Sequence, residues 1–202
     1  MGHKPPKISF EFFPPKSLQA SFDLWESLNV LAPLNPEFVS VTYGAGGTTR
    51  QLTKEMTEAI GKSYGLDVAA HLTCVNASKA ETLAIAKSYV DAGVKQMVAL
   101  RGDAPKGSAG FCPHPQGFAD SVDLVAGLSA TNIKTIHVGA YPEPHPEASN
   151  ANADIDWLKR KIDAGATSAI TQFFFDSEIF LRFRDRCVKA GIHVPIIPGI
   201  LP

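Results

Sequence analysis

The chain is short of cysteine, of net charge and of long apolar runs, and each shortage excludes a class of protein. Its three cysteines, Cys74, Cys112 and Cys187, are odd in number and far apart, so they fit neither a disulfide framework nor a zinc ligand set and favour a reducing cytoplasm. A formal net charge of −1 gives no basic footprint for nucleic acid or for an anionic membrane. The apolar runs have the length of strands, so we expect no membrane span. Residues 1–10, MGHKPPKISF, lack the apolar core of a signal peptide.

What the chain does contain is a regular alternation of strand-like and helix-like patterns. With 202 residues, 45% of them hydrophobic, it can form one large core and is short for two, so we expect a single domain over residues 1–202. The two patterns alternate about every 30 residues, which predicts a parallel sheet with helices outside it. The strand-like runs lie at residues 8–13, 38–43, 68–74, 96–105, 135–141, 168–175 and 194–197.

Local signals mark helix ends and loops. Ser78 followed by Glu81 predicts a capping box at the start of the third helix, and Gly65 is placed to end the preceding helix in a left-handed conformation. The Gly/Pro-rich segment 104–117 is longer than most strand-to-helix connections, so we expect a functional loop there. The glycine-rich segment 44–49 is a weak match to a phosphate-binding turn and serves equally as a tight turn.

The two faces of the predicted strands differ in polarity, which favours a barrel over a doubly wound sheet. A doubly wound sheet buries both faces under helices, whereas alternate residues of a barrel strand face the lumen. The residues that we predict to face the lumen are Ser9, Glu11, Ser40, Thr42, Ala69, His71, Thr73, Ala99, Arg101, Asp103, His137, Gly139, Tyr141, Ile170 and Gln172. The alternating set, which includes Val39, Val41, Leu72, Val98, Leu100 and Val138, is almost wholly apolar. The pattern therefore predicts a (β/α)8 TIM barrel with a polar mouth.

The barrel pattern is incomplete at the C-terminal end. The chain stops at Pro202, just after the seventh predicted strand, so the last βα unit is missing from it. Seven strands alone leave edge strands exposed. We therefore expect a fragment of a longer protein.

Glu11 is the first candidate for chemistry. It lies between Phe10 and Phe12 near the end of the first predicted strand. A carboxylate at an apolar lip loses hydration, which raises its pKa and suits it to general acid catalysis. The alternative is a structural carboxylate that accepts a hydrogen bond from a neighbouring strand.

The fourth strand ends in Arg101, Gly102 and Asp103. The two charged residues either pair with each other or surround a planar polar ligand, in which case Gly102 lets the backbone approach that ligand. Gln172 ends the sixth strand with an amide that suits the edge of a heterocycle. His71 has no second histidine at ligand spacing, so we expect a hydrogen-bonding wall residue and no metal site.

Eight stretches of this chain resemble the methylenetetrahydrofolate reductase family, a family of flavoproteins. Together they cover nearly the whole sequence, and several are long. They are FEFFPPK at 10–16, VSVTYGAGG at 39–47, HLTC at 71–74, ALRGD at 99–103, AYPEPHPEA at 140–148, LKRKIDAGA at 158–166, TQFFFD at 171–176 and IIPGILP at 196–202.

The resemblance implies a barrel that holds FAD across its mouth and reduces 5,10-methylenetetrahydrofolate to 5-methyltetrahydrofolate. NADH or NADPH reduces the flavin first, so the two substrates alternate in ping-pong fashion. The resemblance implies that Glu11 is the general acid for the folate nitrogen, that Asp103 lies near flavin and pterin, and that Thr42 and Gln172 contact the substrates. The implied flavin contacts are Thr42, His71, Leu100, Arg101, Gly102, Asp103, Ala119, Tyr141, His145, Ala148, Asp154 and Lys161. Trp157 stands where some relatives carry a small polar residue, so no contact is assigned to it.

The resemblance also implies a homotetramer that feeds methionine synthesis, with small-molecule substrates and neither nucleic acid nor membrane as partner. Two rival functions stay open at this point. One is another FAD barrel oxidoreductase, such as a proline dehydrogenase-like enzyme. The other is a barrel fragment without activity, against which the array of Glu11, His71, Arg101, Asp103 and Gln172 argues.

Overall fold

The computed structural model describes residues 6–43, 50–103, 111–148 and 150–201. Seven parallel strands form one sheet in the order of the chain, β1-β2-β3-β4-β5-β6-β7. The strands are β1 (Ser9–Phe12), β2 (Phe38–Val41), β3 (Val68–Thr73), β4 (Gln96–Leu100), β5 (Thr135–Ala140), β6 (Ser168–Thr171) and β7 (Ile196–Ile197). The helices between them are α1 (Leu18–Leu31), α2 (Arg50–Tyr64), α3 (Lys79–Asp91), α4 (Ser121–Ser129), α5 (Ala151–Asp163) and α6 (Ser177–Lys189), with a 3₁₀ turn, η1 (Ala32–Leu34), after α1.

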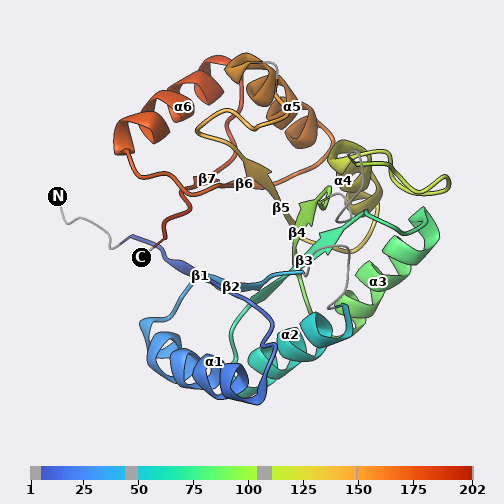
Figure 1. Ribbon diagram of the computed structural model, residues 1–202, viewed down its shortest axis with the longest axis vertical. Coiled ribbons are helices and arrows are strands. Elements are labelled where there is room, and N and C mark those ends of the chain that lie inside the picture. The colour runs from blue at the N-terminus through green and yellow to red at the C-terminus, as the bar shows by residue number, and fades with distance from the viewer. Residues whose placement is uncertain (1–5, 44–49, 104–110, 149, 202) are drawn as a thin grey trace.

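The sheet curls so that its strands line the inside and the helices cover the outside (Figure 1). In the part of the chain that the structure describes, β1 and β7 are the edges of the sheet and do not pair with each other. This is a TIM-barrel-like half-barrel that lacks its final unit, and it confirms the fold that the sequence predicts.

The helix ends form where the sequence predicts them. The Ser78 side chain accepts a hydrogen bond from the Glu81 backbone, and the Glu81 side chain accepts one from the Ser78 backbone, which completes the predicted capping box. Gly65 has a φ of 65°, as expected for a left-handed helix end. Gly93, Gly165 and Gly191, each of which follows an alanine just after a helix, also have positive φ.

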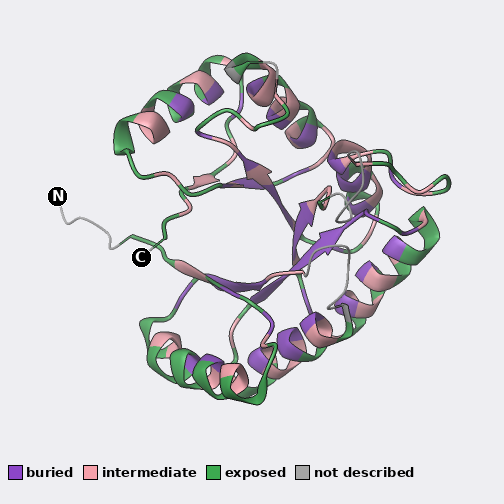
Figure 2. Ribbon diagram, in the orientation of Figure 1, coloured by how far each residue is buried: buried purple, intermediate pink, exposed green. Residues whose placement is uncertain are grey.

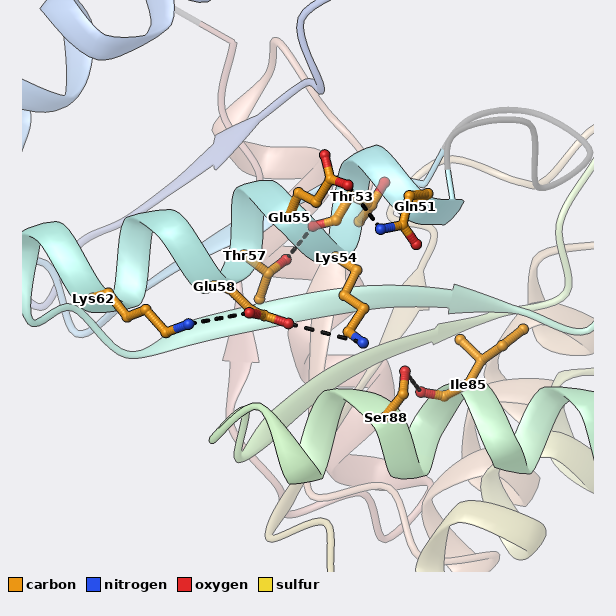
Figure 3. Close-up of polar contacts among 9 residues, drawn as sticks. All are labelled: Gln51, Thr53, Lys54, Glu55, Thr57, Glu58, Lys62, Ile85 and Ser88. Carbon is orange, nitrogen blue, oxygen red and sulfur yellow. Dashed lines mark hydrogen bonds and ion pairs between the residues drawn. The ribbon is translucent and has the colours of Figure 1, made fainter.

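Pairs of side chains one helical turn apart interact along the outer surface of α2 (Figure 3). Glu58 pairs with Lys62 at 3.2 Å and with Lys54 at 3.9 Å, and Gln51 donates to Glu55. Pairs at this spacing stabilise a helix by about 0.2–0.5 kcal/mol each. They mark the solvent face of α2, so its other face packs on the sheet.

The core lies between the helices and the outer face of the sheet, and buried residues concentrate there (Figure 2). One cluster packs β1, β2, α1 and α2 together, and a larger one extends from β3 to the α6 side of the sheet. Fully buried members include Leu28, Ile60, Leu72, Met97 and Leu128. Burying such side chains is the main source of folding free energy.

The prediction of which residues face the lumen is right for most strands and wrong for β4. Val98 clusters with Phe38 and Ala69 on the inner face, with Leu100 and Ile170 packed against them, whereas Ala99 belongs to the helix-side core. The register agrees, because Val98 lies opposite His71 and His137. The sequence pattern assigns the residues of β4 to the wrong faces because QMVAL is apolar at four of five positions and shows no alternation.

The strand ends differ slightly from the prediction. β6 ends at Thr171 rather than at residue 175, because Asp176 caps α6 and the intervening aromatics form a connection. The predicted loop 104–117 has no helix or strand over 111–117. Its remainder, like the segment 44–49, lies outside the described residues.

Candidate active site

A cavity of about 300 Å³ opens on the inner face of the sheet, and we call it the lumen cavity. Its polar wall comes from three adjacent strands, since Glu11 of β1 lies opposite Ser40 of β2, and β3 contributes His71. Oε2 of Glu11 lies 3.2 Å from Nε2 of His71 and accepts a hydrogen bond from the Ser40 hydroxyl at 3.2 Å. The register of the parallel strands therefore builds a carboxylate–imidazole–hydroxyl cluster.

The pKa of Glu11 is shifted in the direction opposite to the prediction. Burial acts to raise it, but the interaction with His71 and the hydrogen bond from Ser40 outweigh burial and lower the pKa below 4.5. The flanking phenylalanines do not determine the pKa of Glu11, because Phe12 points into the helix-side core and the Glu11 side chain keeps 40% of its surface exposed. In the free protein, Glu11 is a carboxylate at neutral pH.

A second polar group closes the bottom of the lumen. His137 is buried, and its Nδ1 lies 2.6 Å from the Ser168 hydroxyl while its Nε2 lies 2.9 Å from Oε1 of Gln96. Its ring stacks on Phe38 at 4.7 Å between centroids. Burial, and secondarily His71, lower the pKa of His137 to about 4. Because the Gln96 oxygen can only accept, Nε2 carries the proton of a neutral imidazole.

The other side of the lumen cavity depends on one glycine. Gly199 donates its N–H to the Thr171 hydroxyl at 2.9 Å, and a Cβ at Gly199 would lie 2.3 Å from the Thr171 carbonyl oxygen. This contact positions the segment after β7 against the end of β6, where Gln172 lines the cavity. Sequence reasoning missed Gly199, although it falls inside the recognised stretch 196–202.

A larger cavity of about 590 Å³ lies beside the first, at the carboxyl ends of β4 and β5 and against α4 and α5. We call it the rim cavity. Leu100, Gly139, Ala140 and Tyr141 line both cavities, so the two adjoin at the ends of β4 and β5. Both volumes fall in the range of small-molecule sites.

Arg101 belongs to the rim cavity, which corrects its predicted place on the lumen face. It follows Ala99 onto the helix side of β4 and binds Glu147 through two hydrogen bonds of 2.7 and 3.1 Å. Its guanidinium also lies 4.9 Å from the centroid of Phe111. Glu147 raises the pKa of Arg101, and Arg101 lowers that of Glu147. Among the described residues, Arg101 thus pairs with Glu147 and not with Asp103.

Gly102 is needed for packing within the protein. Its φ is 88°, and a Cβ there would lie 3.0 Å from both Thr73 and Val75. Gly102 also lines the rim cavity, so the approach of its backbone to a ligand stays a prediction. Asp103, the next residue, is exposed and lines the rim cavity.

Lys161 is the buried cation of the rim cavity. It is 5% exposed, and its Nζ donates to the Gly139 carbonyl oxygen at 2.5 Å. Burial lowers its pKa to about 8, although Asp154 acts to raise it. None of the ion pairs found among the described residues includes Lys161. A buried amine of this kind is costly unless an anion joins it.

The segment between β5 and α5 is fixed by its own contacts. The rings of Tyr141 and His145 meet edge to face at 4.6 Å, and the His145 backbone N–H donates to Oδ2 of Asp154 at 2.9 Å. These contacts hold Ala148 and Glu147 along the rim cavity. Glu147 is the residue here that sequence reasoning missed, although the recognised stretch 140–148 includes it.

The predicted site residues thus fall into three groups. The lumen cavity contains Glu11, His71 and Gln172, and the rim cavity contains Arg101, Gly102, Asp103, His145, Ala148, Asp154 and Lys161, with Leu100 and Tyr141 shared. Thr42 and Ala119 line neither cavity. The Thr42 carbonyl accepts a hydrogen bond from Thr53, and the Ala119 N–H donates to Asp123 near the start of α4.

Two features are absent from the part of the chain that the structure describes. No three histidine, cysteine or acidic side chains gather as metal ligands. No helix in this part of the chain has the length and apolarity to cross a membrane.

Solved structures share this fold at low sequence identity. An uncharacterized protein from Clostridium thermocellum that binds two copies of 5-methyl-5,6,7,8-tetrahydrofolic acid superposes with a TM-score of 0.63 at 13% identity, over 95% of this chain and 65% of that one. A putative lyase/mutase from Burkholderia cenocepacia gives a TM-score of 0.64 at 15% identity, over 98% and 72%. These likenesses concern the fold alone.

Sequence comparisons give closer relatives. The chain is 52% identical to the 5,10-methylenetetrahydrofolate reductases of Salmonella typhimurium and Escherichia coli, over 96% of its own length and 64% of theirs. A methylenetetrahydrofolate reductase (NADH) from Zea mays is 37% identical over 96% of this chain and 35% of that protein. The family profile of methylenetetrahydrofolate reductase matches residues 1–202, and the chain therefore belongs to the methylenetetrahydrofolate reductase family.

Proposed function

We propose that this chain forms the cofactor-binding part of an FAD-dependent enzyme that reduces 5,10-methylenetetrahydrofolate to 5-methyltetrahydrofolate with NADH or NADPH. The observation that carries the proposal is the junction of the two cavities at Leu100, Gly139, Ala140 and Tyr141. A cofactor in the rim cavity can reach this junction and meet a substrate beside Glu11. Membership of the family supports the choice of substrate.

The residues of the rim cavity fit FAD. The lining of the cavity runs from the ends of β4 and β5 to α5, and its buried amine, Lys161, has no carboxylate in an ion pair with it among the described residues. Lys161 would hold the phosphates of FAD, which would be the anion that this amine lacks. Bound FAD would supply the redox chemistry that links hydride from the nicotinamide to reduction of the folate.

The lumen cavity suits one substrate at a time. Its volume of about 300 Å³ is at the low end for ligand sites, so nicotinamide and pterin must occupy it in turn. Gln172 at its wall offers a donor and an acceptor to either heterocycle. This supports the ping-pong order.

The lowered pKa of Glu11 is compatible with an acid role once a substrate is bound. Burial is the largest single influence on this carboxyl, and 40% of the side chain faces solvent in the free protein. A pterin that covers Glu11 removes that water and raises the pKa of Glu11 from its lowered value in the free protein, which favours the protonated form. Glu11 then donates its proton to the folate nitrogen, while Ser40 and His71 hold the carboxyl in place.

We also place the reaction in the cytoplasm, in agreement with the three free cysteines, as a source of methyl groups for methionine synthesis. The homotetramer implied by the resemblance stays a prediction.

The test is the visible spectrum of the protein purified as its complete gene encodes it. An absorption band at about 450 nm, the usual position for oxidised flavin, should bleach with NADH or NADPH under anaerobic conditions and return with methylenetetrahydrofolate. If another oxidant restores the band and methylenetetrahydrofolate does not, the protein is a different flavin oxidoreductase. A colourless protein that takes up no added FAD would overturn the proposal.

A further inference from the structure

The proposed reaction consumes one proton for each folate, and the free protein does not keep that proton on Glu11. Although burial acts to raise the pKa of Glu11, His71 and Ser40 hold it below 4.5, so the side chain is a carboxylate at neutral pH. A general acid needs its proton at the moment of the reaction. A neighbouring group that holds the proton until the substrate arrives would resolve this conflict.

His71 is placed to be that group. Its ring is buried, and its Nε2 lies 3.2 Å from Oε2 of Glu11. The Ser40 hydroxyl donates to the same carboxylate oxygen, so a second strand holds Oε2 beside Nε2. Among the described residues, Nε2 has no other hydrogen-bond partner. Histidine is the side chain whose charge ordinarily changes between pH 5 and 8, which suits it to hold a proton that a neighbour needs.

The other groups around His71 do not compete for this proton. β2 and β4, which flank β3, line the cavity with a serine and with apolar side chains, and the described lining from β6 and β7 contains no ionisable group. On β5, burial and secondarily His71 lower the pKa of His137 to about 4, so this ring is neutral at pH 7. Burial raises the pKa of Tyr141, which therefore keeps its own proton. Glu11 and His71 remain as the pair that can exchange a proton.

A substrate that covers this pair drives the proton in one direction. Loss of water disfavours the charged form of a carboxylate and of an imidazolium alike. One transfer from Nε2 to Oε2 removes both charges at once, which avoids burying an ion pair. We propose that His71 stores the proton for folate reduction as an imidazolium paired with the Glu11 carboxylate, and that it passes this proton to Glu11 when the pterin covers the pair, an inference that rests on the proposed function.

Protons and electrons balance over one turnover. The Nε2–H bond of His71 breaks as an O–H bond forms on Glu11. That O–H bond breaks in turn as the folate nitrogen takes the proton and its bond to the methylene carbon opens. The hydride of the proposed reaction adds to this carbon, so the folate is reduced and the nicotinamide is oxidised. When the product leaves and water returns, His71 takes one proton from water, which is the proton that the overall reaction consumes.

NMR of histidine ring nitrogens tests the stored proton without turnover. At pH 7, both ring nitrogens of His71 should carry protons in the complete protein, whereas in Glu11→Gln, which lacks the carboxylate, the ring should be mostly neutral. Methylenetetrahydrofolate added to the parent protein with oxidised flavin, where no reduction takes place, should convert the ring to its neutral form. A neutral ring in the free parent protein, or a ring that stays charged beside bound methylenetetrahydrofolate, would overturn the proposal.

The pH dependence of folate reduction tests the transfer. In the parent protein, the rate of flavin reoxidation by methylenetetrahydrofolate should stay level at low pH and fall only where His71 loses its proton. In His71→Gln, Glu11 takes its proton from water, so the rate should fall about tenfold per pH unit between about pH 6 and 8 and be roughly 100- to 1,000-fold below the parent rate at pH 7.

Ser40→Ala is the matched control, because it removes the other contact of Oε2 and leaves the imidazole in place. This variant should keep the shape of the parent pH profile. The proposal is wrong if His71→Gln keeps the parent profile, or if Ser40→Ala changes it in the same way as His71→Gln.

The two proposals fail in different ways. If the His71 ring is charged in the free protein but methylenetetrahydrofolate neither binds nor reoxidises the flavin, the proposed function is wrong and the charged pair of Glu11 and His71 stands. If the folate is reduced by a protein whose His71 ring is neutral throughout, the stored proton is wrong and the enzyme stands.

Discussion

The two faces of the same sheet differ in what their side chains do. On the helix side, Leu72, Met97 and Val138 are fully buried in apolar surroundings. On the lumen side, Ser40, His71, His137 and Ser168 are buried as well, yet they are polar. Both faces therefore carry buried side chains, but the apolar ones on the helix side lower the free energy of the fold, whereas the polar ones on the lumen side are held in fixed positions.

The lumen face is itself graded along the strands. At its bottom, the protein satisfies its own polar groups, since both nitrogens of His137 have partners. At the carboxyl ends, Glu11 remains partly exposed. In the adjoining rim cavity, Lys161 of α5 lacks a carboxylate in an ion pair with it among the described residues. Polar groups near the mouth are left to a ligand, which is where parallel barrels place their chemistry.

The largest effect should come from the helix side. Leu72→Ala removes a fully buried side chain and should lower the free energy of unfolding by about 2–5 kcal/mol. Ile170→Ala, on the lumen face, should cost less, because Ile170 is only partly buried and borders the lumen cavity. Urea unfolding of both variants measures the difference, and equal or reversed costs would contradict the division between the faces.

The next effect concerns the buried amine of the rim cavity. Lys161 loses its proton near pH 8 in the folded protein, against an ordinary value of 10.5. Between these values the unfolded chain binds more protons, so the free energy of unfolding should rise with pH. The full rise from this group is about 3 kcal/mol, since each tenfold step in proton affinity is worth about 1.4 kcal/mol. Below pH 8, both states hold the proton and the cost of burial is fully present.

Comparison of variants isolates Lys161 from the other groups that titrate in this range, such as the two buried cysteines. In Lys161→Met, the free energy of unfolding should rise less steeply with pH, because the contribution of residue 161 is gone. Lys159→Met changes a lysine on the same helix that pairs with Asp163, and this variant should keep the full pH dependence. If both variants retain the slope of the parent protein, the buried charge is not its cause.

The smallest effect lies at the bottom of the lumen. Ser168→Ala removes the hydroxyl at 2.6 Å from Nδ1 of His137 and should cost about 1 kcal/mol, because the ring nitrogen stays buried without its partner. Ser27→Ala, on the exposed side of α1, should stay within about 0.5 kcal/mol of the parent protein. Similar costs for the two would show that the His137 network adds nothing beyond an ordinary surface hydroxyl.

The fold could be predicted from the sequence where polarity alternates. A single polar residue between two apolar ones shows which side of the strand faces the lumen. This holds for Ser40 between Val39 and Val41 in β2, and for His71 between Ala70 and Leu72 in β3. β4 offers no such alternation, so only its register with His71 and His137 places Val98 on the inner face. A uniformly apolar strand needs its neighbours to define which side is which.

The site was predicted as a set of residues but not as a set of contacts. The sequence places Glu11 beside phenylalanines, while the groups that lower its pKa against the effect of burial, His71 and Ser40, come from two other strands. It placed Arg101 beside Asp103, while its partner, Glu147, is 46 residues away. Electrostatics at this site depends on such long-range partners, and no local pattern encodes them.

The proposed function assigns to Glu11 the proton for folate reduction and no part in the reduction of the flavin by NADH or NADPH. Glu11→Gln keeps the shape of the side chain and removes its acid. In the complete protein loaded with FAD, reduction of the flavin by NADH or NADPH should stay within a few-fold of the parent rate. Reoxidation by methylenetetrahydrofolate should fall roughly 100- to 10,000-fold, the usual cost of removing a positioned proton donor. Equal losses in both half-reactions, or an unchanged rate of reoxidation, would contradict the account.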